Sequence, residues 1–102
     1  MKECCRTYLN EQLGDDAEAV DAIYAEYVTS IGAKIGEADA ALAEGAWDTL
    51  DRVAHTFKGN SLAVGDQQMA DTAIALRNAA KLQERDQTAQ LIADMKALAE
   101  QL

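Results

Sequence analysis

Residues 15–45 read DDAEAVDAIYAEYVTSIGAKIGEADAALAEG and predict one long amphipathic helix. Asp15 and Asp16 can accept hydrogen bonds from the free N–H groups at a helix start, and Gly45 can adopt the left-handed conformation that often ends a helix. Between them, apolar side chains recur every three or four residues, the period of one helix face. The predicted face is Val20, Ile23, Tyr24, Tyr27, Val28, Ile31, Ile35, Ala38 and Leu42. Such a face requires other helices to cover it.

Four further helices are predicted around this one. A short helix over about residues 3–13 precedes it and stops at Gly14, one over about 47–64 follows and closes at Gly65, one starts at Asp66, and Asp86 begins the last. The short connections between them favour antiparallel neighbours. We therefore expect an all-α fold, with residues 1–102 forming one domain: an antiparallel up-down-up-down four-helix bundle with a short additional N-terminal helix.

The composition is that of a strongly acidic helical protein. The 102 residues include no proline and carry a net charge of −9. This charge argues against a nucleic-acid partner, because proteins neutralise phosphates with clustered Lys and Arg. No apolar run approaches the roughly 20 residues of a membrane span, and the N-terminus lacks the apolar stretch of a secretory signal. We expect a cytoplasmic monomer that does not bind membranes.

Cys4 and Cys5 are adjacent, and the single histidine of the chain is fifty positions away. Neither a CxxC pair nor a set of zinc ligands is present, and a disulfide between neighbours would be strained. We interpret the two cysteines as reduced thiols near a frayed end, with no metal site.

Gly32 and Gly36 lie four residues apart inside the long helix, where glycine costs up to about 1 kcal/mol relative to alanine. Close approach of a neighbouring helix would explain both glycines, and we favour that explanation. Room for a docking partner is the alternative.

His55 lies on the outward side of its predicted helix. At about 100° per residue, Leu50, Val53, Phe57 and Val64 cluster opposite it. A lone histidine is more often structural than functional, but this one faces solvent, with Lys58 one turn away as a cation for a phosphate.

Three further residues mark the face of His55 as a contact surface. Gly59 removes a side chain beside the histidine, at a cost to helix stability that a purely structural helix would not be expected to carry. Leu62 is an apolar residue on the same face, and Ala63 is nearby. Together with the histidine and lysine, they favour a partner-binding surface.

Residues 55–65, HTFKGNSLAVG, resemble the signature of histidine phosphotransfer (HPt) domains. In that signature an accepting histidine is followed at three and four positions by Lys-Gly and at ten by another glycine. The resemblance extends less sharply over nearly the whole chain, including the long preceding helix, the hairpin at residues 41–48 and the two following helices.

The resemblance implies that His55 accepts a phosphoryl group and exchanges it with aspartates of response-regulator receiver domains, in a relay that begins at a sensor histidine kinase. Lys58 would stabilise the phosphoryl group and Gly59 would leave room for the receiver. Arg52, Asn60, Leu62 and Ala63 are the expected partner surface. No cofactor of its own is expected, and magnesium would belong to the receiver.

Two positions depart from the family pattern. Asn60 stands where the family commonly has serine, and it can still donate a hydrogen bond. Arg77 stands where many members carry an acidic residue. Both departures bear on details of the surface rather than on the phosphoryl acceptor.

Two other functions compete with the phosphocarrier. One is an interaction module that binds through the same face and is never phosphorylated. The other is an enzyme with His55 as general base, which would need an oriented carboxylate and a pocket. Since the chain has neither a GxxxxGK[ST] loop nor a GxGxxG element, we expect no kinase activity of its own. Asp48, Asp51 and Arg52 are interpreted as a solvated face, with partner contact as the alternative.

Overall fold

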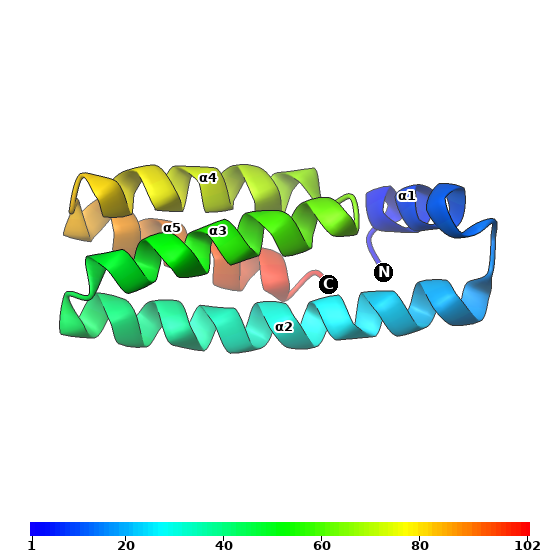
Figure 1. Cartoon of the computed structure of the whole chain (residues 1–102), viewed down its shortest axis with the longest axis horizontal. Helices are drawn as coiled ribbons and strands as arrows, with labels where there is room; N and C mark the ends of the chain where they lie inside the picture. Colours follow the sequence, from blue (N-terminus) through cyan, green and yellow to red (C-terminus); the bar gives the residue numbers. More distant parts are fainter.

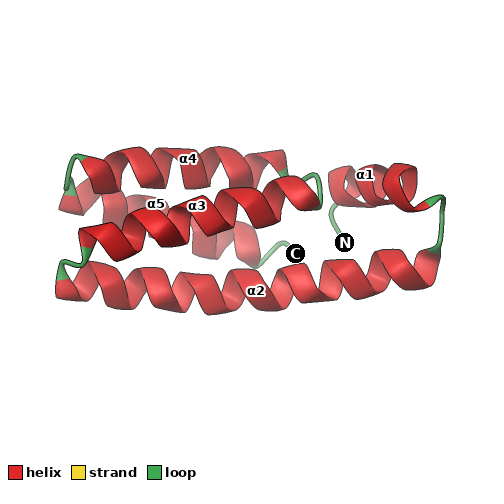
Figure 2. Ribbon diagram, in the orientation of Figure 1, coloured by secondary structure: helices red, strands yellow, loops and turns green.

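A computed structural model describes all 102 residues as five helices without strands (Figures 1 and 2). They are α1 (Glu3–Leu13), α2 (Ala17–Glu44), α3 (Trp47–Ala63), α4 (Gln67–Lys81) and α5 (Arg85–Ala99). Helices α2 to α5 run antiparallel in sequence order, and α5 closes the bundle against α2. The predicted all-α bundle with a short extra N-terminal helix is confirmed. None of the helices is long and apolar enough to cross a membrane.

The helix ends follow the predicted capping residues closely. The carboxylate of Asp16 accepts a hydrogen bond from Ala19 N at 3.2 Å and begins α2, and Gly45 ends that helix with φ of 67°. Asp66 accepts from Met69 N at 3.3 Å and begins α4. Helix α5 begins at Arg85, one residue before the predicted Asp86.

The core lies along the centre of the long helix stripe. Tyr24, Tyr27, Ile31, Ile35 and Ala38 of α2 are buried, as predicted. Two residues of the predicted stripe are not in the core, since Ile23 and Val28 keep 37% and 38% of their surface exposed. They lie at the margins of the stripe, and the helices packed on α2 cover only its centre. The stripe drawn from the sequence was therefore too wide.

Gly32 and Gly36 contact no neighbouring helix. Both are exposed, and a Cβ built on either would meet nothing within 4 Å. The explanation by close helix approach is wrong, because this face of α2 points to solvent.

Helix α1 fills the end of the molecule where α2 extends past the turn between α3 and α4 (Figure 1). Its Cys5 and Leu9 are buried in the core. Gly65 has φ of 74°, and a Cβ on it would lie 2.5 Å from Cβ of Tyr8. Only glycine fits at this turn, both for its backbone conformation and for the closeness of α1.

The N-terminal region is not frayed, which corrects the interpretation of the cysteines. Cys5 is fully buried, whereas Cys4 is exposed, and their sulfurs lie 4.0 Å apart as free thiols. Burial, the neighbouring Cys4 and the negative charge of Asp66 raise the pKa of the Cys5 thiol to about 12. The buried thiol behaves as a core residue.

A buried polar cluster joins α1 to the bundle, and we call Lys2, Tyr27, Ser61 and Asp66 the Asp66 cluster. The Asp66 carboxylate accepts hydrogen bonds from Lys2 Nζ at 2.8 Å and Tyr27 Oη at 2.6 Å. The Tyr27 hydroxyl oxygen also lies 3.4 Å from Ser61 Oγ. Burial and the Asp66 carboxylate raise the pKa of Tyr27. No buried side-chain polar atom of the chain lacks a partner.

Candidate functional site

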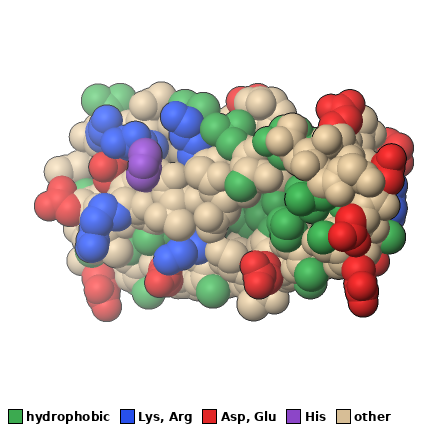
Figure 3. Space-filling model, turned by 45° about the vertical axis from the view of Figure 1, so that its right-hand side comes forward, with side chains coloured by type: hydrophobic (Ala, Val, Ile, Leu, Met, Phe, Trp, Pro, Cys, Tyr) green, Lys and Arg blue, Asp and Glu red, His purple; other side chains and the backbone are tan.

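His55 is exposed in the middle of α3. Leu50, Val53 and Phe57 of the same helix are buried in the core, so the predicted outward orientation of the imidazole is confirmed. Figure 3 shows the histidine on an open part of the surface, with Lys and Arg side chains gathered around it.

Arg77 of α4 is the side chain that contacts the imidazole. Its Nη1 lies 3.3 Å from Nδ1 of His55. Its Nε donates a hydrogen bond to Oδ1 of Asp51 at 2.9 Å, which ties α4 to α3 one turn before the histidine. The guanidinium therefore bridges a carboxylate and the imidazole.

Lys58 and Gly59 lie on the following turn of α3. Lys58 is half-buried, and its ammonium group makes no hydrogen bond or ion pair within the chain. Gly59 is exposed, and a Cβ on it would meet nothing within 4 Å. The open space beside His55 and the unpaired cation agree with the roles expected for these residues.

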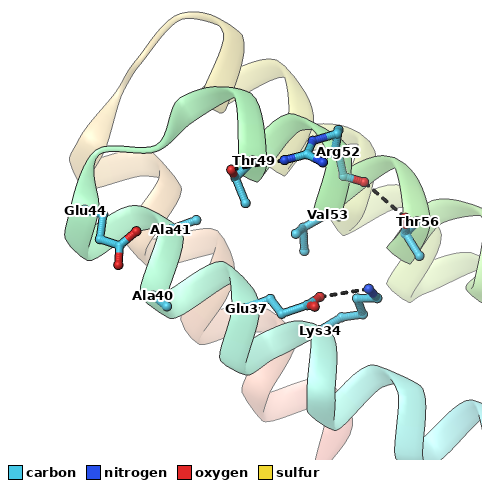
Figure 4. A pocket seen from close by; sticks show the side chains of 9 residues that line it. All are labelled: Lys34, Glu37, Ala40, Ala41, Glu44, Thr49, Arg52, Val53 and Thr56. Atoms are coloured by element: carbon cyan, nitrogen blue, oxygen red, sulfur yellow. Dashed lines mark hydrogen bonds and ion pairs between the residues drawn. The ribbon is translucent and has the colours of Figure 1, made fainter.

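Arg52 adds a third cation to the histidine surface, after Lys58 and Arg77. It is exposed, and its Nη2 donates to Thr49 Oγ1 at 3.3 Å. It also lines a groove of about 460 Å³ between α2 and α3, where Lys34 and Glu37 of α2 face it (Figure 4). Lys34 pairs with Glu37 at 2.8 Å, which leaves Arg52 as the cation of this groove without a carboxylate partner.

The remaining predicted partner residues divide between two places. Leu62 is 40% exposed on the histidine side of α3. Asn60 and Ala63 instead line a second groove of about 290 Å³ between α2 and α3. The Asn60 amide donates to Ser30 Oγ at 2.8 Å, so its N–H contributes to packing between these helices. The structure thus brings Leu62, but not Asn60, to the face of His55.

The interpretation of the three charged residues on α3 needs one correction. Asp48 is exposed and makes no ion pair, as expected for a solvated face. Asp51 is paired with Arg77 and only half exposed, so it belongs to the site.

Arg77 is the residue of the site that sequence reasoning did not find. The sequence singled it out only as a departure from a family pattern. Its contact with His55 joins two helices across 22 positions, so no spacing along one helix could reveal it. Asp51 did carry a local signal, because it lies four residues before the histidine on the same helix face.

No group of three or more His, Cys, Asp or Glu side chains in the chain could hold a metal ion. What the site offers is an exposed imidazole, two cations that make no ion pair and one guanidinium held by a carboxylate. This arrangement is suited to an anionic group on or beside the imidazole.

Residues 22–102 match the family model of the Hpt domain. The chain belongs to the Hpt domain family. Hpt domains are helical phosphocarriers that take part in histidine phosphotransfer within phosphorelays. The match covers the four-helix bundle and leaves α1 and the first turn of α2 outside it. No curated protein and no solved structure matches the chain.

Proposed function

We propose that His55 is the phosphoryl acceptor of this Hpt domain and that it exchanges the group with aspartates of response-regulator receiver domains. The phosphoryl group would enter the relay from a sensor histidine kinase. The observation that carries the proposal is the exposed imidazole among Arg52, Lys58 and Arg77, in a chain whose net charge is −9.

The local positive charge is unexpected in such an acidic molecule and calls for a reason. A phosphoryl group brings close to two negative charges and three acceptor oxygens, which nearby Lys and Arg side chains stabilise. Lys58 and Arg52 are both available to do so, because neither has a competing carboxylate. A phosphate on His55 would therefore account for the cluster of cations around it.

The reaction needs little else from this chain. A neutral ring nitrogen attacks the phosphorus of an aspartyl phosphate, an N–P bond forms, the P–O bond breaks, and the carboxylate of the receiver leaves as an anion. Catalysis of such a transfer is largely positioning and charge neutralisation. We infer that magnesium and the acidic pocket belong to the receiver, that this chain has no kinase activity of its own, and that it works as a monomer.

Docking requires an open approach to the imidazole. Gly59 leaves the space beside His55 unfilled, and Leu62 offers an apolar contact on the same face. Arg52 and its groove extend this surface toward α2. Asn60 and Ala63 would meet a partner only if it reached over the second groove. The surrounding acidic surface would steer association rather than add affinity.

The decisive experiment incubates the protein with a phosphorylated receiver domain, or with a kinase and receiver plus ATP and magnesium. Intact mass before and after acid treatment then reports acid-labile phosphate. We expect one phosphoryl group on the wild type, none on His55→Gln, and onward transfer to a fresh receiver. Circular dichroism of His55→Gln should match that of the wild type, because the imidazole is exposed.

Lys58→Gln tests how much the nearby positive charge contributes to the rate of phosphoryl transfer. It keeps the acceptor and should still take phosphate, but more slowly, because one cation near the transferring group is lost. Receiver binding without phosphate on the wild type, across several receivers, would contradict the carrier role and favour the docking module. Turnover of a substrate by the protein alone would favour the general-base enzyme.

A further inference from the structure

The contact between Arg77 and His55 constrains where the imidazole carries its proton. A guanidinium has N–H donors and no acceptor. Its Nη1, 3.3 Å from Nδ1, can hydrogen-bond to that nitrogen only when Nδ1 is unprotonated. In a neutral imidazole the single ring proton then resides on Nε2, for which no partner exists within the chain.

We propose that Arg77 is a positioning residue that holds resting His55 with its ring proton on Nε2, and that it must leave Nδ1 before Nε2 can accept a phosphoryl group. The second half of this inference rests on the proposed function. The first half concerns the unphosphorylated protein and stands independently.

The guanidinium is held in place from the other side. Arg77 Nε donates to Asp51 Oδ1 at 2.9 Å, and the two side chains are only 35% and 31% exposed. Asp51 and His55 lie four residues apart on α3, so one planar guanidinium can reach both. Arg77 is thus directed at Nδ1 by a carboxylate that belongs to the same helix as the histidine.

The chemistry of transfer conflicts with this resting arrangement. For Nε2 to form the N–P bond, its in-plane lone pair must be free, and the ring proton must be on Nδ1. A protonated Nδ1 is a donor and cannot accept from Arg77, so two donors would face each other. The guanidinium has to move away while the imidazole changes tautomer. In that change Nε2 loses its proton to water and Nδ1 takes a proton from water. The arriving phosphoryl oxygens then give the guanidinium a new acceptor.

The tautomer can be measured directly because His55 is the only histidine of the chain. Two-bond ¹H–¹⁵N spectra, recorded at a pH that leaves imidazole neutral, distinguish a protonated from an unprotonated ring nitrogen. We expect Nδ1 unprotonated and Nε2 protonated in the wild type. Arg77→Gln removes the guanidinium donor to Nδ1, so the population ratio of the two tautomers should move toward Nδ1–H by about three- to tenfold, the worth of one hydrogen bond.

Lys81→Gln is the matched control. It removes the same charge from the same helix, one turn beyond Arg77, at an exposed lysine that makes no ion pair. Its tautomer ratio should equal that of the wild type. Asp51→Asn keeps the guanidinium but weakens its anchor, so its ratio should lie between those of the wild type and Arg77→Gln.

The kinetic arm measures phosphoryl entry from a phosphorylated receiver at saturating receiver concentration. Because Arg77→Gln frees Nδ1 but also removes a cation near the transferring group, we expect it to slow phosphoryl entry less than Lys58→Gln does, and Lys81→Gln to leave the rate unchanged. An identical tautomer ratio in the wild type and Arg77→Gln would overturn the inference, as would phosphoryl entry that is slowed as much in Arg77→Gln as in Lys58→Gln. A shifted ratio in a protein that takes no phosphate at all would instead overturn the carrier function and leave the positioning role of Arg77 intact.

Discussion

Two ion pairs of nearly the same length join elements of this chain, and their surroundings differ. Lys2 and Asp66 are 2.8 Å apart at the α1 end, with the Asp66 side chain fully buried and Lys2 15% exposed. Arg77 and Asp51 are 2.9 Å apart beside the histidine, with about a third of each side chain exposed. The Lys2–Asp66 pair lies within a polar cluster in which every buried side-chain atom has a hydrogen-bond partner. The Arg77–Asp51 pair instead leaves N–H groups of the guanidinium free to contact the imidazole.

The comparison shows that burial, not distance, separates a structural ion pair from one that can serve a reaction. Removing one member of a buried pair leaves the other charge without compensation. A half-exposed pair can part, because water replaces the lost contact at little cost. The α1 end is therefore fixed, and the histidine end can exchange partners during the proposed phosphoryl transfer.

The largest predicted loss of stability falls in a pair of matched substitutions, Asp66→Asn and Asp51→Asn. Asp66→Asn should lower the free energy of unfolding by about 3 kcal/mol, because Lys2 and Tyr27 lose a buried carboxylate. Asp51→Asn should cost less than about 1 kcal/mol. Urea denaturation of both variants measures the difference, and equal losses would refute the distinction drawn from burial.

Two glycines, Gly59 inside the histidine helix and Gly65 just beyond its end, sharpen the same contrast. Gly65→Ala should destabilise by about 2 kcal/mol, since an alanine at φ of 74° is strained and its Cβ would overlap Tyr8. Gly59→Ala should stabilise by about 0.5 to 1 kcal/mol, because it is an open mid-helix position.

Gly59→Ala should change the rate of phosphoryl transfer and the stability of the protein in opposite directions. Gly59→Ala places a methyl group where we propose that the receiver approaches, so transfer should slow even though the protein is more stable. Thermal denaturation and the intact-mass assay together test this. If Gly59→Ala transfers phosphate as fast as the wild type, the receiver does not need the open space at Gly59.

A further predicted effect is an alkaline loss of stability that begins at the α1 end. The pKa of Cys5 is raised to about 12 in the folded state, from an ordinary value near 9. A raised pKa means that the folded state favours the neutral thiol. This stabilisation is complete below about pH 9 and is lost as pH rises toward 12.

Cys5→Ala removes this titration and provides the test. Between pH 8 and pH 10, the wild type should lose about 1 kcal/mol more unfolding free energy than Cys5→Ala. Urea denaturation under reducing conditions measures it. Because each protein is compared with itself, the small cavity left by alanine does not enter the result. Parallel pH profiles would show that Cys5 does not titrate with unfolding.

Much of the fold could be predicted because its signals are local. Asp16, Asp66 and Gly45 mark helix ends through their own backbone and side-chain chemistry, and the structure uses each as predicted. The errors arose where packing decides. Ile23 and Val28 share the periodicity of the core but lie beyond the surface that the neighbouring helices cover. Gly32 and Gly36 were assigned to a helix contact that does not exist.

The sequence by itself determined the five helices, the outward orientation of His55 and the presence of Lys58 and Gly59 one turn beyond it. These features depend on spacing within one helix, whose geometry is fixed by the backbone. Only the tertiary structure decided that Arg77 reaches Nδ1 of His55, that Asp51 holds it there and that Cys5 of α1 is buried in the core. The physical reason is that each of these contacts depends on how separate helices or turns pack, and packing sets which side chains meet and which remain in water.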